Sequence, residues 1–265
     1  MYQTTYHRPS SVDEAAALFG KGKEAKYLAG GQTLIPVMKQ RLSAPSDVID
    51  LGKIKELVGV DVSADTVTIK AATPHYDVAS DGDVQKAIPA LAHLASLIGD
   101  PAVRHRGTIG GSVANNDPNA DYPAACLGLA ATIVTTKRKI VADEFFKGLF
   151  ETALEPDEII TRVSFPIPKK AAYQKFRNQA SRYALVGVFV AKRPSEIRVA
   201  VTGAGGSGVF RVKEFEDALK KRFSPKVLEG LSVPADGMAS DIHGSAEYRA
   251  HLIGVLARRA VAAAG

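Results

Sequence analysis

Apolar residues at helical and alternating spacing divide the start of the chain into short helices and strands. Ser11-Val12-Asp13-Glu14 fits a capping box that opens a helix running through Leu18. Lys26–Ala29 predicts a short buried strand, after which the chain turns sharply and helical spacing returns from Thr33 to Arg41. Residues 47–51 predict a further strand. This part of the chain is therefore expected to form a small α/β unit.

A hairpin opens a second unit. Leu57–Val62 and Thr66–Ala71 alternate apolar and polar positions around a polar turn. Pro89–Ile98 has the pattern of an amphipathic helix, and the glycine- and proline-rich stretch 99–121 predicts an ordered loop around a bound group. Beyond it we expect one helix and two strands, namely Tyr122–Leu129 behind Asp121 as a candidate N-cap, Thr132–Thr135 and Thr161–Phe165.

Pro166 and Pro168, which are followed by two lysines, mark a boundary in the chain. After this boundary the apolar pattern predicts two strands and two helices. They are the strands Ala184–Ala191 and Ile197–Val201 and the helices Val212–Leu219 and Ala246–Ala263.

Two segments share a chemistry suited to a bound anion: Ala29-Gly30-Gly31-Gln32-Thr33 and Thr108-Ile109-Gly110-Gly111-Ser112. Each places paired glycines beside a hydroxyl residue, so consecutive backbone N–H groups can converge on a diphosphate without a Cβ in the way. For the same reason we expect a side chain at Gly31 or Gly110 to intrude where the backbone meets the phosphate. Taken singly, a Gly-Gly pair is more often a tight turn before a satisfied helix start.

A third glycine cluster, residues 203–208, spells the string G-x-G-x-x-G after the predicted strand that ends at Val201. The dinucleotide fingerprint also requires a helix that opens on the last glycine and an acidic residue about 20 positions further on. Here residues 209–212 intervene before helical spacing begins, and Glu229 follows no convincing strand. We therefore predict a turn between strands at this cluster.

Composition narrows the class of protein. Cys126 is the only cysteine, so the chain can form no internal disulfide and cannot ligate an iron–sulfur cluster alone. The six histidines lack the paired spacing of a zinc site, and no bound metal is expected. The net charge of +6 comes from dispersed basic residues, which favours solvated surfaces over nucleic-acid binding. Because no apolar run reaches signal-peptide or transmembrane length, we expect a soluble cytoplasmic protein.

The glycine segments also carry a family resemblance. Residues 29–34 and 106–112 resemble the two FAD loops of molybdenum hydroxylase flavoprotein subunits of the carbon monoxide dehydrogenase medium-subunit type, in order and separation as well as in sequence. Further similarity lies in residues 117–121, 155–160 and 173–176, so the resemblance covers essentially the whole chain. The chain departs from the family pattern at three positions: Thr33, where serine is commoner, Gln179 and Arg182.

The resemblance implies an α+β fold. A two-lobed FAD-binding domain, made of a small α/β lobe and a mixed α/β lobe, would be followed by a C-terminal domain of antiparallel sheet and helices. We place the N-terminal lobe at residues 1–56, the middle lobe at residues 57–168 and the C-terminal domain at residues 169–265.

The resemblance also implies which residues bind FAD. Residues 29–33 and 108–112 would bind the pyrophosphate, and Asp121 would hydrogen-bond the ribose or adenine end. From the residues alone, Asp121 is equally consistent with a helix cap. The full implied set is Ala29, Gly30, Gly31, Gln32, Thr33, Leu34, Thr108, Ile109, Gly110, Gly111, Ser112, Asn115, Asp121, Ile159, Ile160, Lys175 and Tyr183.

The remaining implied roles concern the ring systems. Ile159 or Ile160 would pack beside the flavin or adenine, Lys175 would lie near the rings, and Tyr183 would cover one flavin face. Without the resemblance, the two isoleucines are equally consistent with a strand core and Tyr183 with a half-buried aromatic residue. Lysines such as Lys175 are more often solvated.

By resemblance, the chain is the FAD-binding electron-transfer subunit of a molybdenum-containing dehydrogenase. It would take electrons from [2Fe–2S] clusters of a small partner subunit, fed by a large molybdopterin-binding partner, and pass them to an external acceptor. The assembly would be a heterotrimer or a dimer of heterotrimers. No catalytic acid or base is expected from this chain, because the redox chemistry belongs to the flavin. A stand-alone flavin oxidoreductase and a non-enzymatic nucleotide-binding scaffold subunit remain open alternatives.

Overall fold

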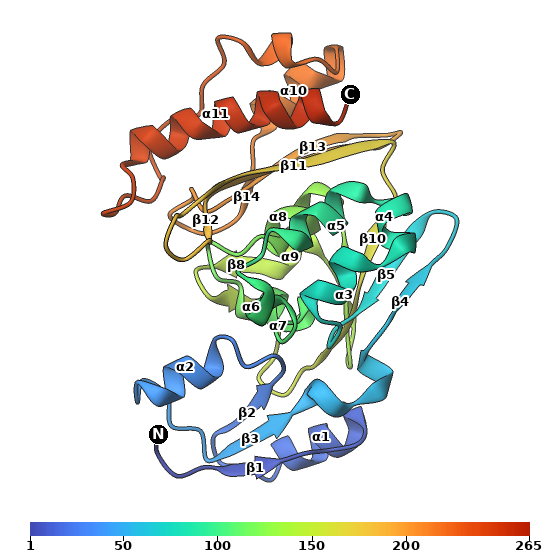
Figure 1. The fold of residues 1–265 in the computed structure, drawn as a ribbon, viewed down its shortest axis with the longest axis vertical. Coiled ribbons are helices and arrows are strands. Elements are labelled where there is room, and N and C mark those ends of the chain that lie inside the picture. Colours follow the sequence, from blue (N-terminus) through green and yellow to red (C-terminus); the bar gives the residue numbers. More distant parts are fainter.

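The computed structural model describes residues 1–265, and its elements form three layers along the long axis of the molecule. Figure 1 shows the N-terminal sheet at one end and the C-terminal sheet, covered by its long helix, at the other end. A mixed unit of sheet and short helices lies between them. None of the helices is both long and apolar enough to cross a membrane.

The N-terminal layer is a small parallel sheet in the order β1-β3-β2. The Ser11 hydroxyl accepts from the Glu14 backbone N–H, as the capping pattern predicts, whereas the Glu14 carboxylate accepts from Ser10 rather than from Ser11. The elements of the N-terminal layer are β1 (Thr5–His7), α1 (Val12–Phe19), β2 (Ala25–Leu28), α2 (Leu34–Lys39), β3 (Asp47–Asp50) and the 3-10 helices η1 (Leu51–Lys53) and η2 (Lys55–Leu57).

The middle layer is an antiparallel sheet in the order β4-β5-β10-β6-β7, covered by short helices. A hydrophobic core between the sheet and the helices holds these elements together. The strands are β4 (Val60–Val62), β5 (Thr66–Lys70), β6 (Thr132–Thr135), β7 (Lys139–Val141) and β10 (Ile160–Pro166), with a separate small pair β8 (Phe146–Gly148) and β9 (Glu151–Thr152). The helices are α3 (His75–Ser80), α4 (Gly82–Ala87), α5 (Pro89–Ser96), α6 (Pro101–Arg104), α7 (Ile109–Asn115), α8 (Tyr122–Gly128) and α9 (Ala142–Phe145).

Residues 99–121 are not the continuous loop that their glycines and prolines predict, because they contain α6 and α7. The Thr108 hydroxyl caps α7 by accepting from the Gly111 N–H, so both glycines of the second segment lie in the first helical turn. The helix ends at Asn116, which adopts the left-handed conformation with φ 43°. Local capping therefore outweighs the low helix propensity of glycine here.

The C-terminal layer is an antiparallel sheet in the order β11-β12-β13-β14. The side chains of β12 alternate between two cores: Val188 packs toward the C-terminal helices and Phe189 packs toward the middle layer. Residues 203–208 connect β13 to β14 and form the predicted turn between strands. The elements are β11 (Lys170–Arg177), β12 (Ala184–Lys192), β13 (Ile197–Thr202), β14 (Phe210–Arg211), α10 (Lys213–Lys221), η3 (Pro225–Leu228) and α11 (Ala246–Ala263).

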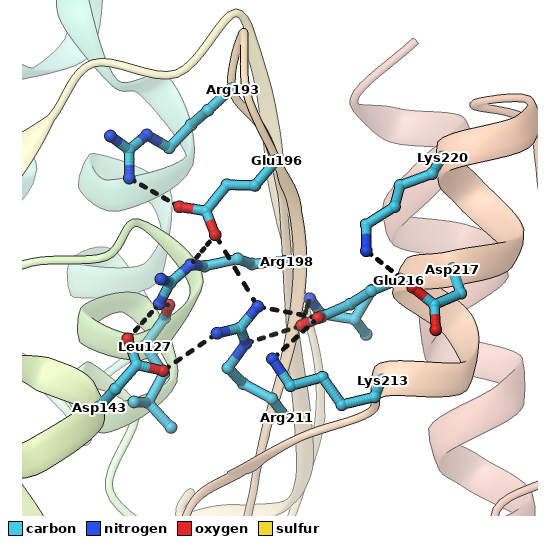
Figure 2. A network of polar contacts seen from close by, with 11 residues as sticks. Leu127, Asp143, Arg193, Glu196, Arg198, Arg211, Lys213, Glu216, Asp217 and Lys220 are labelled. Carbon is cyan, nitrogen blue, oxygen red and sulfur yellow. Dashed lines mark hydrogen bonds and ion pairs between the residues drawn. The ribbon is translucent and has the colours of Figure 1, made fainter.

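A network of charged side chains joins the middle layer to the C-terminal sheet (Figure 2). The Asp143 carboxylate, on α9, accepts from Arg198 on β13 at 2.6 Å and from Arg211 on β14 at 3.0 Å. Arg198 also donates to the Leu127 carbonyl on α8, and Arg211 donates to Glu216 on α10. Both guanidinium groups are mostly buried, with 11% and 13% of their side chains exposed, whereas 39% of the Asp143 side chain is exposed, so water partly screens these bonds.

The variant Asp143→Asn tests this connection. It should lower the free energy of unfolding by roughly 1–3 kcal/mol, because two charge-assisted bonds lose their acceptor charge and the site is partly solvated. A denaturant titration measures the change. The matched control is Asp217→Asn, whose ion pair with Lys220 lies on the exposed side of α10 and should contribute little. Equal effects of the two substitutions would contradict a specific role for Asp143.

Candidate functional site

The two glycine segments meet in space, although they are far apart in the sequence. A Cβ built on Gly30 would lie 2.1 Å from the Arg106 carbonyl oxygen and 2.6 Å from the Gly107 Cα. A Cβ on Gly111 would lie 3.5 Å from the Ala29 Cβ. The N-terminal layer therefore contacts the middle layer through backbone atoms, at a distance that only glycine permits at position 30.

A cavity of about 700 Å³ extends between the two layers at this contact. This volume lies within the range of pockets that bind cofactors and other small molecules. Fifteen of the seventeen residues that the sequence nominates line it: Ala29, Gly30, Gly31, Gln32, Thr33, Leu34, Thr108, Gly110, Gly111, Ser112, Asn115, Asp121, Ile159, Ile160 and Tyr183.

The two glycine segments do not present their amides in the same way. The backbone N–H groups of residues 30–33 donate to no protein acceptor, so they are available to a ligand. The N–H groups of residues 109–112 all donate within the protein, to Thr73, Ala71 and Thr108. The second segment therefore does not offer an anion the free amides that the sequence predicted, because its N–H groups hold the start of α7 against its neighbours.

The structure gives a further reason for glycine at positions 31 and 110, besides the expected approach of the backbone to a phosphate. A Cβ on Gly110 would lie 2.6 Å from the Ala71 Cβ, and one on Gly31 would lie 2.6 Å from the Ile35 Cδ1. Gly31 in addition has φ +73°, a conformation that disfavours other residues. Both glycines are needed by the protein's own packing and backbone before any ligand is considered.

Two nominated residues, Ile109 and Lys175, do not line the cavity. The Ile109 side chain is fully buried in the middle core, because it lies on the inner face of α7. Lys175 on β11 is 2% exposed and donates to Asp121 at 2.9 Å and to the Leu97 carbonyl at 3.1 Å. Lys175 is thus neither solvated nor part of the wall, and it holds Asp121 from behind.

Asp121 lines the cavity but does not cap α8, because its side chain makes no cap hydrogen bond. One carboxylate oxygen accepts from Lys175 and the other from the Tyr173 hydroxyl at 2.5 Å. Burial raises the pKa of Asp121, against the opposing effect of Lys175 and Tyr173. The carboxylate is therefore held in one orientation at the cavity wall.

Ile159 and Ile160 connect the two layers through adjacent side chains. Ile159 packs into the N-terminal core, and Ile160 packs into the middle core. The residue before them, Glu158, was missed by sequence reasoning although it lies within the similar stretch 155–160. Its buried carboxylate accepts from Arg138, from the Thr135 hydroxyl and from the Glu155 N–H, which fixes the segment that carries the isoleucines.

A tight turn borders the outer part of the cavity. The cavity is lined here by Ser181, Arg182 and Tyr183. The Asn178 side chain stabilises the turn by accepting hydrogen bonds from the N–H groups of Ala180 and Ser181. Arg182 adopts φ 61°, a conformation uncommon for residues other than glycine. Tyr183 is 45% exposed, as expected of an aromatic side chain at the edge of a cavity.

Comparison with known proteins identifies the family. A family model described as the FAD binding domain in molybdopterin dehydrogenase matches residues 2–168, and one described as the CO dehydrogenase flavoprotein C-terminal domain matches residues 171–264. The chain belongs to this flavoprotein family. It is the FAD-binding medium subunit of a multi-subunit molybdenum hydroxylase, its cofactor is FAD, and the predicted α+β fold is confirmed.

Individual relatives span nearly the whole chain. The carbon monoxide dehydrogenase medium chain of Hydrogenophaga pseudoflava is 36% identical over 275 residues, which cover 98% of this chain and 96% of the relative. The nicotine 6-hydroxylase medium subunit of Paenarthrobacter nicotinovorans is 37% identical over 274 residues, with 98% and 96% covered. A solved structure of carbon monoxide dehydrogenase from H. pseudoflava gives a TM-score of 0.88 at 36% identity and covers 99% of this chain and 97% of that chain.

The cavity of this flavoprotein subunit suits FAD. Four adjacent backbone amides without protein acceptors match the diphosphate, which accepts hydrogen bonds and carries negative charge. The Thr33 hydroxyl makes no cap bond and adds a further possible donor beside them. When bound, FAD supplies the electron-accepting and electron-donating chemistry, while the chain binds and orients it.

The variant Gly30→Ala tests the contact between the two segments. Gly30 does not have a positive φ, so alanine meets no backbone penalty and only the close approach to Arg106 and Gly107 is disturbed. We expect a loss of roughly 1–3 kcal/mol in unfolding free energy and an FAD affinity about ten-fold or more lower. Titration of the apoprotein with FAD measures the affinity. Gly82→Ala, where a Cβ would have no neighbour within 4 Å, is the control and should bind FAD normally.

The variant Glu158→Gln tests the buried carboxylate beside the isoleucines. Burial raises the pKa of Glu158, but the hydrogen bonds from Arg138, Thr135 and the Glu155 N–H outweigh it and lower the pKa from 4.5 to about 2. Ionised Glu158 therefore stabilises the fold above pH 4.5, and this contribution is lost as the pH falls toward 2.

At neutral pH the wild type should be more stable than Glu158→Gln by up to about 3 kcal/mol. The difference should shrink as the pH is lowered below 4.5 in a series of denaturant titrations. A stability difference that stays constant across the acidic range would contradict this assignment.

Proposed function

We propose a specific arrangement for FAD in this subunit. The N–H groups of residues 30–33 bind the diphosphate, while residues 108–112 form the opposite wall through Thr108, Gly111 and Ser112. Asp121 hydrogen-bonds the ribose or adenine end. This arrangement is supported by the free amides of the first segment and by the fixed carboxylate of Asp121 at the wall.

The ring systems occupy the apolar and outer parts of the cavity. Ile159 and Ile160 pack beside the flavin or adenine, and Tyr183 covers one face of the flavin. Lys175 orients Asp121 instead of contacting the rings, in keeping with its burial and its ion pair. The division into an N-terminal lobe at 1–56, a middle lobe at 57–168 and a C-terminal domain at 169–265 is part of the same proposal, supported by the three separate sheets.

The enzyme is completed by two partners in this proposal: a large molybdopterin-binding subunit and a small [2Fe–2S] subunit, in a cytoplasmic heterotrimer or dimer of heterotrimers. The iron–sulfur clusters pass electrons to FAD, and FAD passes them to an external acceptor. The cysteine content supports this division, because the single, fully buried Cys126 cannot supply the thiolates of a cluster.

The substrate of the whole enzyme is selected outside this chain. Relatives named for carbon monoxide and for nicotine are 36% and 37% identical to it, so equal similarity accompanies unrelated substrates. The cavity described above is explained by the cofactor, and a subunit that only transfers electrons needs no contact with the substrate.

The observation that carries the proposal is the meeting of the two glycine segments at one cofactor-sized cavity. The isolated full chain should bind about one FAD per chain, detected by absorbance and mass spectrometry of the released cofactor. Bound FAD should be reduced by a chemical reductant, but the chain alone should not turn over candidate substrates.

Pull-down of the tagged chain from its native cells should recover a molybdenum-containing subunit and an iron–sulfur subunit. Steady turnover by the chain alone would favour a stand-alone flavin oxidoreductase instead. A chain that binds its partners but no FAD would favour a nucleotide-binding scaffold subunit.

A further inference from the structure

His75 lies directly behind the contact between the two glycine segments. It is the first residue of α3, it is 4% exposed, and it lines the cavity. Its backbone N–H donates to the Gly107 carbonyl at 2.9 Å. Its ring covers the same residue, since a Cβ on Gly107 would lie 2.7 Å from the His75 Nε2. Gly107 is in turn the residue against which Gly30 packs.

The imidazole of His75 has no hydrogen-bond partner in the protein. Its Nδ1 is fully enclosed and unpaired, and no side-chain hydrogen bond involves Nε2. Nε2 is not enclosed, so it is the ring atom that a partner in the cavity can reach, and polar groups in protein interiors are nearly always paired. The ring of Tyr122 packs against the imidazole at 5.4 Å between centroids and limits its rotation.

The surroundings of His75 keep the ring neutral. Burial, with a smaller effect of the nearby Arg104, lowers its pKa to about 4. A neutral imidazole carries one N–H and one lone pair. An enclosed N–H without an acceptor is rarer in proteins than an under-satisfied acceptor, so the lone pair belongs at the enclosed Nδ1 and the proton at Nε2.

We infer that His75 is a cofactor-binding residue whose Nε2–H donates a hydrogen bond to a diphosphate oxygen of FAD. The inference rests on the proposed function. The diphosphate is the acceptor because Nε2 lies against Gly107, where the middle layer meets Gly30 and the free amides of residues 30–33 begin. The role also accounts for glycine at position 107, since any side chain there would displace the ring.

Three substitutions of His75 test this role in the full chain. His75→Phe keeps a planar ring but removes both nitrogens. His75→Gln places an amide nitrogen near the position of Nε2, whereas His75→Asn places one near the position of Nδ1. Affinity is measured by calorimetry for FAD and for ADP, which carries a diphosphate without a flavin. Thermal unfolding without ligand measures stability.

The expected result is a loss of about ten- to a hundred-fold in affinity for both FAD and ADP in His75→Phe and His75→Asn. His75→Gln should recover most of this affinity. The stability of the unliganded His75→Phe variant should stay close to that of the wild type, because the removal of an unpaired buried group offsets the tighter fit of the larger ring against Gly107.

Other outcomes would overturn the inference. Wild-type FAD affinity in His75→Phe would mean that the ring only fills space. A less stable His75→Phe variant with unchanged FAD affinity would mean the same. Weaker binding of FAD with unchanged binding of ADP would place the contact on the flavin side. A wild-type chain that binds no FAD would instead contradict the proposed function.

Discussion

The cavity depends on one backbone contact, the approach of Gly30 to Arg106 and Gly107. At this point the N-terminal sheet and the helices of the middle layer touch without any side chain between them. The contact sets the separation of the two layers and holds the free amides of residues 30–33 beside the opposite wall. Because close packing transmits small displacements, a side chain at this contact would alter the whole cavity.

Two buried carboxylates in the cavity wall are each paired with a cation. Glu158 is neutralised by Arg138, and Asp121 by Lys175. Burying a charge is unfavourable unless it is paired and hydrogen-bonded, and both carboxylates meet this condition. His75 differs from them, since it is buried in the same wall with no protein partner. The protein itself explains the paired groups, whereas the proposed bond to the diphosphate explains only the Nε2 side of His75.

The C-terminal sheet supports the cavity from behind. It contributes Tyr173 and Lys175 to the fixation of Asp121, and Asp143 joins it to the middle layer through two arginines. Both faces of the sheet are covered, so β12 contains an almost continuous run of buried residues. The domain therefore stabilises the site without lining most of it, which fits a subunit whose task is to hold one cofactor in a fixed position.

The sequence, through its glycine segments and its family resemblance, indicated the fold class, the cofactor and fifteen of the residues that line the cavity. Local signals are strong at Ser11, at the hairpin before Thr66 and along the helix Ala246–Ala263, because capping, alternation and helical periodicity depend on near neighbours. Paired glycines beside hydroxyl residues also remain recognisable without a structure. Strand β11 escaped prediction because its polar residues, such as Lys175, find partners only in other layers.

Only the tertiary structure decided what each of these residues contacts. It shows that Gly110 packs on Ala71, that the amides of residues 109–112 are used within the protein, and that Ile109 faces the core. It also brings His75 to the wall. The local sequence around these residues does not predict such contacts, because each partner lies on an element that is distant along the chain. Local pattern thus determined which elements to expect, and the family resemblance indicated the cofactor. Long-range packing determined which atoms remain free to bind that cofactor.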